Sequence, residues 1–142
     1  MGRLIPPDEG LIYLDANCFI YSVEHIEPYG TLLEPVWRRG GIVTSEITRL
    51  EVLVKPFQAG DEGLAEVYRQ LLNASEVECL PLSAAILKQA ARLRAATGIK
   101  TPDAIHAASS LARNAVLFLS NDKQFRNIPS LPFAYLHDQA GG

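Results

Sequence analysis

The sequence predicts an α/β fold in which helices cover both faces of a central, mostly parallel sheet of about four to five strands. Short apolar runs alternate with helical segments of about 10 to 15 residues, the pattern of consecutive βαβ units. The chain has 142 residues, of which 48% are hydrophobic, so it can fill one buried core. We therefore expect residues 1–142 to form a single three-layer domain.

The first half of the chain holds two strand candidates and three helix candidates. The apolar run LIYL and the run GIVTS are typical of buried strands, and the first ends directly before Asp15. Residues 29–41 predict a short helix that ends in glycines. Two further helices are predicted by apolar residues that recur on one helical face: Ile47, Leu50, Leu53, Val54 and Phe57 in residues 45–57, then Leu64, Val67, Leu71 and Leu72 in residues 60–75.

The second half continues the same alternation. VECLPL and AVLFLSND are strand candidates, and PFAYLHD is a candidate for a last edge strand. Between the first two of these strands, residues 83–98 form a predicted helix that Ser83 caps and Gly98 ends. The following helix begins with Thr101 as the N-cap and Pro102 at the first helical position.

Composition restricts the class of protein. A formal net charge of −3 disfavours a protein that wraps nucleic acid through bulk electrostatics, but it is compatible with a nuclease whose site is acidic. The only two cysteines, Cys18 and Cys79, predict buried free thiols in a reducing compartment. Because Asp15 and Asn17 interrupt the apolar run at residues 11–23, we expect no membrane span, no signal peptide and a cytoplasmic protein.

Acidic residues follow two of the predicted strands. Asp15 comes after LIYL and Asp122 after VLFLSN, while Asp103 opens the helix before the second of these strands. Open α/β sheets place their sites outside the carboxyl ends of the strands. If the two strands are neighbours, the three carboxylates face one crevice, and a divalent cation such as Mg²⁺ or Mn²⁺ would relieve their repulsion.

Each acid also has a purely local explanation. Asp122 can cap the turn that follows it, Asp103 suits the first turn of a helix, and Glu51 can pair with Lys55 one turn later. Asp15 is harder to explain locally, since a carboxylate at the end of a buried strand needs a hydrogen-bonding partner or a cation.

Four segments resemble the acidic motifs of the PIN-domain family in order and spacing: YLDANCFIY, TSEITRLEVLV, TPDAIHAA and LSNDKQF. The resemblance implies a PIN-like α/β/α fold in which Asp15, Glu51, Asp103 and Asp122 are the catalytic, metal-binding acids. It also implies that Ser120 supports the last of them. Small members resemble VapC-type toxins, which are Mg²⁺- or Mn²⁺-dependent endoribonucleases held in check by an antitoxin. RNA as substrate, an antitoxin partner and a homodimer are therefore expected by analogy.

Several assignments remain open at this stage. Glu46 competes with Glu51 as the helical acid, and Glu51 is favoured because the apolar VLV follows it. His106 shares a helix face with Asp103, although a lone histidine makes a poor zinc site. Asn17 can order a water or a substrate phosphate, or cap the following helix. Candidates for contacting RNA phosphates are Arg92, Arg94, Lys100, Lys123 and Arg126.

Two other functions are compatible with the sequence. One is a PIN-like module that binds RNA or protein without cleaving it. The other is a phosphoryl-transfer domain with Asp15 as nucleophile, which Asn17 disfavours because phosphoaspartyl phosphatases carry a second aspartate at that position.

Overall fold

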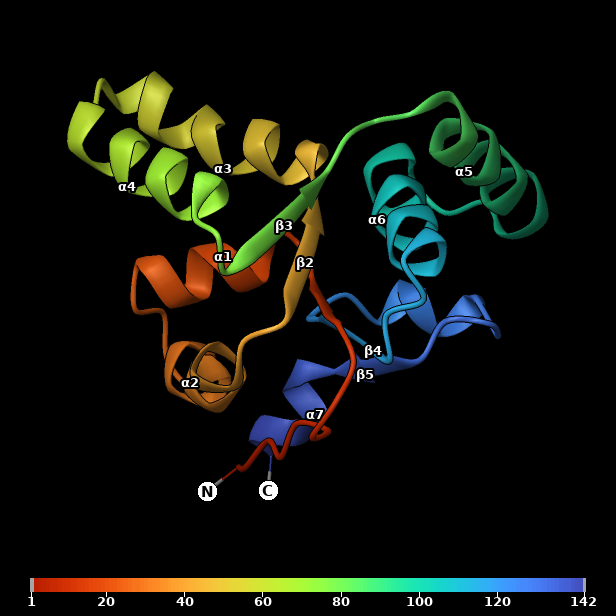
Figure 1. Ribbon diagram of the computed structural model, residues 1–142, viewed down its shortest axis with the longest axis horizontal. Helices are drawn as coiled ribbons and strands as arrows, with labels where there is room; N and C mark the ends of the chain where they lie inside the picture. Colours follow the sequence, from red (N-terminus) through yellow and green to blue (C-terminus); the bar gives the residue numbers. More distant parts are fainter. Residues whose placement is uncertain (1, 142) are drawn as a thin grey trace.

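The computed structural model describes residues 2–141 and confirms the α/β architecture (Figure 1). The strands in this part of the chain are β1 (Ile12–Leu14), β2 (Ile42–Ser45), β3 (Val77–Leu80), β4 (Leu117–Ser120) and β5 (Phe133–Tyr135). The helices are α1 (Ala16–Val23), α2 (Tyr29–Arg39), α3 (Glu46–Ala59), α4 (Glu62–Asn73), α5 (Ala84–Thr97), α6 (Thr101–Ala112) and α7 (Leu136–Ala140), with a 3₁₀ helix η1 (Lys123–Asn127).

The five strands form one sheet in the order β3-β2-β1-β4-β5, and every neighbouring pair is parallel. The chain lays down β1, β2 and β3 in one direction across the sheet and then returns to add β4 and β5 on the other side of β1. The strands LIYL and VLFLS, whose adjacency the sequence left as a condition, are thus neighbours, with Leu14 beside Leu119.

Alternating side chains of the central strands supply the two cores. Ile12, Leu14 and Leu119 pack against the face covered by α1, α2, α3, α4 and α7. Tyr13 and Phe118, which point the opposite way, pack among residues of α5, α6 and η1. The two groups of helices lie on opposite sides of the sheet in Figure 1. Strands buried on both faces explain why the sequence shows continuous apolar runs there.

The apolar face predicted for α3 is confirmed at Ile47 and Leu53, which pack partly against the two cores, and is wrong for its other three residues, Leu50, Val54 and Phe57. Leu50 and Phe57 are 60% and 57% exposed, whereas Val52 is 2% exposed. The helix instead turns Thr48, Val52 and Pro56 toward the core, at intervals of four residues. A threonine can occupy this face because the Thr44 and Thr48 hydroxyls lie 2.8 Å apart and satisfy each other.

Helix ends agree with the sequence in most places. Ser83 caps α5 by accepting the Ile86 backbone N–H, and Gly98 ends it in the left-handed conformation. The prediction of Thr101 as an N-cap is wrong by one residue, since Lys100 holds that position without a side-chain cap. The Thr101 hydroxyl accepts a hydrogen bond from Arg94 instead. The edge strand in PFAYLHD is confirmed as β5, but the short helix α7 after it was not predicted.

Both cysteines are free. Cys18 is fully buried in α1, as predicted, and Cys79 in β3 is partly buried. Within residues 2–141, no helix has the length and apolar character needed to cross a membrane.

Candidate functional site: acidic residues at the crossover of the sheet

The candidate site lies where the chain reverses its direction across the sheet, between β1 and β4. Both strands end at the same edge, and Asp15 follows β1 directly while Ser120 is the last residue of β4. Open α/β sheets leave a crevice at such a point because the two connections leave in opposite directions.

Asp15 is buried and held on both carboxylate oxygens. Its Oδ1 accepts the backbone N–H of Cys18 at 3.2 Å, which makes Asp15 the N-cap of α1. Its Oδ2 accepts the Ser120 hydroxyl at 2.5 Å. Burial raises the pKa of Asp15, while the neighbouring His106 and the Ser120 hydroxyl act in the opposite direction. Asn17, for which capping was one alternative, is exposed, so Asp15 and not Asn17 caps this helix.

Asp103, in the first turn of α6, lies close to Asp122. Burial, and then the Asp122 carboxylate, raise the pKa of Asp103 to about 6. Asp122 also caps η1, because its Oδ1 accepts the Gln124 N–H at 2.9 Å. Its own backbone N–H donates to the Ser120 hydroxyl at 3.0 Å, so Ser120 links Asp15 to Asp122. Asp122 therefore caps η1 and also lies beside Asp103.

Glu51 reaches the site from α3. Its Oε1 lies 2.7 Å from Nε2 of His106, so Glu51 bonds to α6 and not to Lys55, its local alternative partner. Glu46, the competing acid, forms an ion pair with Arg49 at 2.6 Å. Since Glu51 lines the same pocket as Asp15 and Glu46 does not, the geometry favours Glu51 as the site acid.

One pocket of about 480 Å³ brings these residues together. Asp15, Glu51 and Asp103 line it together with Asn17 and His106. Asp122 is not part of its wall, although it is close enough to raise the pKa of Asp103. No three His, Cys, Asp or Glu side chains within residues 2–141 are already arranged as a metal site.

Sequence reasoning missed three residues of this region. Tyr21 in α1 and Glu24, the residue that follows this helix, also line the pocket, and Glu24 accepts a hydrogen bond from the Tyr68 hydroxyl. Tyr13 lies beneath the pocket, where its hydroxyl contacts Nδ1 of His106 at 2.7 Å. A tyrosine in the middle of a buried strand needs a polar partner for its hydroxyl, and this requirement is the feature of the sequence that could have identified Tyr13.

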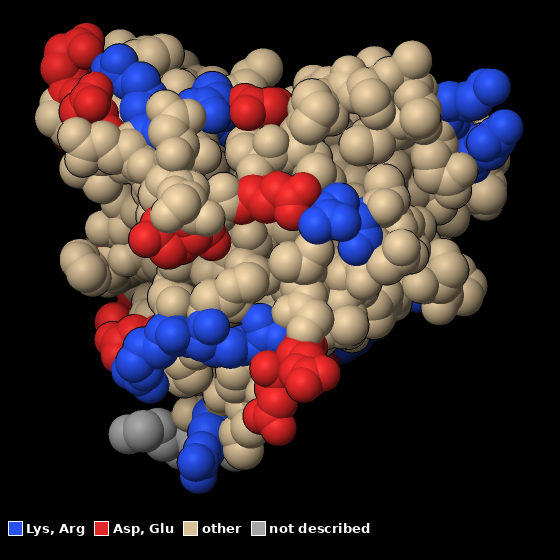
Figure 2. Space-filling model, viewed as in Figure 1, with Lys and Arg blue, Asp and Glu red and all other residues tan. Residues whose placement is uncertain are grey.

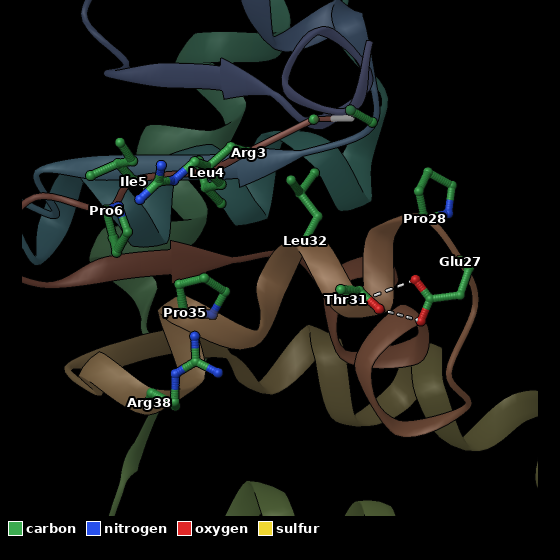
Figure 3. A pocket seen from close by; sticks show the side chains of 12 residues that line it. Arg3, Leu4, Ile5, Pro6, Glu27, Pro28, Thr31, Leu32, Pro35 and Arg38 are labelled. Atoms are coloured by element: carbon green, nitrogen blue, oxygen red, sulfur yellow. Dashed lines mark hydrogen bonds between the residues drawn. The ribbon is translucent and has the colours of Figure 1, made fainter. Parts of the chain in front are cut away.

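A larger cavity, of about 770 Å³, lies elsewhere, between the N-terminal segment and α2 (Figure 3). Its walls are mostly apolar or prolyl, and its one acid, Glu27, is engaged by the hydroxyl and backbone N–H of Thr31. This cavity has no cluster of acids among its described lining residues. The lining residues therefore favour the smaller pocket as the candidate site.

Some of the residues predicted to contact RNA phosphates already bond to other groups of the protein. Arg94 donates to the Ile99 carbonyl and to Thr101, and so holds the connection between α5 and α6. Arg126 pairs with Asp138 at 2.8 Å. The others, Arg92, Lys100 and Lys123, are exposed. On the face shown in Figure 2, acidic and basic side chains are interspersed and no large patch of one sign covers it.

Comparison with solved structures gives the same fold in three bacterial assemblies. A chain of VapBC2 from Rickettsia felis, bound to promoter DNA, has a TM-score of 0.70 at 22% identity, covering 88% of this chain and 98% of that chain. A toxin–antitoxin complex from Klebsiella pneumoniae has a TM-score of 0.70 at 22% identity, with 87% and 95% covered. FitAcB from Neisseria gonorrhoeae reaches 0.66 at 18% identity, with 89% and 99% covered.

A comparison with curated proteins found no match. The PIN domain family, in contrast, matches residues 12–131, a range that begins at β1 and includes all four acidic motifs. This match covers most of the chain and agrees with the resemblance noted in the sequence. The chain belongs to the PIN domain family.

Proposed function

We propose that this protein is a Mg²⁺- or Mn²⁺-dependent endoribonuclease that acts in the cytoplasm as the toxin of a toxin–antitoxin pair. The observation that carries the proposal is the convergence of Asp15, Glu51 and Asp103 from three elements on one pocket at the crossover of a PIN fold. Carboxylates gathered without a neutralising arginine are typical of sites for hard divalent cations.

The carboxylate side chains at this site are of the kind that such a cation binds. Asp15, Asp103 and Asp122 would hold it, and Glu51 would complete the set. The two hydrogen bonds to Asp15 occupy one lone pair on each oxygen, so each oxygen keeps another for an ion. When bound, a divalent cation activates water and neutralises charge on a phosphodiester.

The protein's own side chains would orient the substrate. Ser120 and the Cys18 N–H fix the Asp15 carboxylate, so this acid needs little reorganisation on binding. Lys55, exposed on the wall of the pocket, is suited to a phosphate, and Tyr21 offers an aromatic face to an unpaired base. Hydrolysis would leave a 3′-hydroxyl and a 5′-phosphate, as the family resemblance implies.

An antitoxin is the proposed partner, and a homodimer is proposed by analogy with the family. The structural neighbours from Rickettsia felis and Klebsiella pneumoniae are toxin–antitoxin complexes. In this chain an exposed apolar row on α3, made of Leu50, Val54 and Phe57, reaches the pocket at Val54. An apolar row beside an acidic pocket suits a partner that covers the row and inserts a basic side chain among the carboxylates.

The two alternatives have less support. A nucleophilic Asp15 is disfavoured by Asn17, because phosphoaspartyl phosphatases carry a second aspartate at that position, and it would leave Glu51 without a role in the pocket. A binding module that had lost catalysis would not need all of its acids, whereas Asp15, Glu51 and Asp103 all line the pocket here.

Incubation of purified, antitoxin-free protein with structured RNAs tests the proposal. Cleavage is expected with Mg²⁺ or Mn²⁺ and not with EDTA, the products should carry 5′-phosphates, and Asp15→Asn should be inactive. Cleavage that persists in EDTA and in the variant would contradict a metal nuclease. A stable phosphoaspartate would instead support the phosphoryl-transfer alternative.

The partner is tested by co-expression with the neighbouring open reading frame. We expect the product of that reading frame to relieve the growth arrest that the toxin causes alone. The double substitution Leu50→Asp and Phe57→Asp should prevent this relief and leave RNA cleavage intact. Unchanged growth arrest on co-expression with the unaltered toxin would rule out that partner.

A further inference from the structure

We propose that His106 and Tyr13 act as positioning residues that fix the Glu51 carboxylate at the edge of the acidic pocket, and that His106 is not itself a metal ligand. This inference rests on the proposed function, because it assigns a task within the same site. It is carried by a chain of hydrogen bonds that links three elements: Tyr13 in β1, His106 in α6 and Glu51 in α3.

The chain of contacts is short and shielded from water. The Tyr13 hydroxyl lies 2.7 Å from Nδ1 of His106, and Nε2 of His106 lies 2.7 Å from Oε1 of Glu51. Tyr13 is fully buried and the His106 side chain is 3% exposed, whereas the Glu51 side chain is 31% exposed. The line of contacts therefore runs from the core outward and ends at the pocket.

The donors and acceptors assign the hydrogen on the imidazole. An ionised carboxylate only accepts, so Nε2 of His106 donates to Glu51. The buried phenol needs an acceptor for its own hydrogen, and Nδ1 lies within reach. In the neutral ring Tyr13 therefore donates to Nδ1, and neutral His106 is held as the tautomer with its hydrogen on Nε2.

This assignment leaves His106 without a nitrogen for an ion. A metal needs a ring lone pair, but Nε2 carries its hydrogen and the lone pair of Nδ1 accepts from Tyr13. The D-x-x-H pattern of α6 then has two separate tasks. Asp103 reaches the pocket directly, and His106, one turn later, acts on it through Glu51.

Fixing Glu51 matters because its side chain is long and partly exposed. An unrestrained glutamate samples many rotamers, and their loss on metal binding opposes affinity. One oxygen held by a rigid ring leaves Oε2 as the atom available to the pocket. Tyr13 is itself held by stacking on Phe118, with ring centroids 5.0 Å apart and planes within 4°. Partners of this kind, which hold a metal-binding side chain in place, commonly change metal affinity by about 10- to 100-fold.

Manganese binding, measured by electron paramagnetic resonance, tests the inference without relying on activity. We expect Tyr13→Phe and His106→Ala to weaken Mn²⁺ binding by about 10- to 100-fold. Tyr13→Phe keeps the ring that stacks on Phe118 and removes only the hydroxyl. Ser110→Ala is the matched control, since it removes a buried hydroxyl of the same helix α6 that has no hydrogen-bond partner among the described residues. Its Mn²⁺ affinity should stay at the parental value.

A double-mutant cycle separates positioning from direct ligation. If His106 acts through Glu51, then His106→Ala should cause no further loss of Mn²⁺ affinity in a Glu51→Ala background. A full further loss in that background would make His106 a ligand and overturn the inference. Parental affinity in both Tyr13→Phe and His106→Ala would overturn it as well, although the proposed function would stand. Absence of Mn²⁺ binding by the parent would instead overturn both.

A measurement on the unaltered protein keeps the inference testable even if the His106 variants fold poorly. Nitrogen-15 NMR of the imidazole should find the hydrogen of neutral His106 on Nε2 and none on Nδ1, and Tyr13→Phe should perturb the Nδ1 signal. A neutral ring with its hydrogen on Nδ1 would contradict the assignment.

Discussion

Asp15, Asp103 and Asp122 each carry a local structural role and a place in the candidate site. Asp15 caps α1 and Asp122 caps η1, while Asp103 occupies the first turn of α6. The sequence predicted the helix-start roles of the last two and the strand-end position of Asp15. It left Asn17 as a cap candidate, because an aspartate and an asparagine near a helix start are equally favourable locally. The Cys18 backbone N–H, which donates to the Asp15 carboxylate, decides between them.

The Asp103 carboxylate should lower the stability of the metal-free protein. Its pKa rises from 3.8 to about 6, so the folded state binds this proton more tightly than the unfolded state does. The free energy of unfolding therefore falls as the pH rises from about 4 to about 6, and the deficit persists above that range. Since the group is only half-buried, solvent screening reduces the deficit to about 1 kcal/mol.

Asp103→Asn should consequently be more stable than the parent by about 1 kcal/mol in EDTA at pH 8, and equally stable below about pH 4. Urea unfolding at the two pH values measures this difference. A variant less stable than the parent at pH 8 would contradict the repulsion between Asp103 and Asp122.

At the level of single elements, strands and helix ends were predictable and the buried face of α3 was not. Apolar runs and capping residues such as Ser83 and Gly98 act within a few residues, so the sequence reveals them directly. The orientation of α3 depends instead on what it packs against. The paired hydroxyls of Thr44 and Thr48 allow a polar residue inward, and three apolar residues of α3 remain exposed: Leu50, Val54 and Phe57.

A matched pair of substitutions on α3 tests this orientation. Val52→Ala should destabilise the fold by about 2 kcal/mol, since it removes two buried methyl groups and leaves a cavity. Leu50→Ala, which removes more apolar surface but from an exposed position, should change stability by less than about 0.5 kcal/mol. Chemical denaturation of both variants provides the comparison. Equal losses of stability in the two variants would mean that the Leu50 side chain is buried within the folded chain.

For the whole molecule, the decisive feature is the strand order. The sequence predicted parallel strands and a crevice, on the condition that the strands ending near Asp15 and Asp122 are neighbours. The pairing of β1 with β4, which lie about a hundred residues apart in the chain, fulfils that condition. Local patterns do not encode such a long-range pairing, so the sequence left it as a condition.

The same limit explains why the Tyr13–His106–Glu51 chain was missed. His106 and Glu51 are 55 residues apart, and Tyr13 and His106 are 93 apart. Spacing within one helix suggested only that His106 shares a face with Asp103. Its partners became apparent once the sheet had brought β1, α3 and α6 together.

The central claim is that the acidic pocket cleaves RNA. The most direct test compares the rate of RNA cleavage in Mn²⁺ among the parent, Asp15→Asn and Glu76→Gln. Glu76 is an exposed acid outside the pocket, so its variant removes the same charge without touching the site. The acidic pocket at the crossover predicts that Asp15→Asn falls to the rate seen in EDTA while Glu76→Gln cleaves like the parent. Equal cleavage by the parent and Asp15→Asn would contradict it.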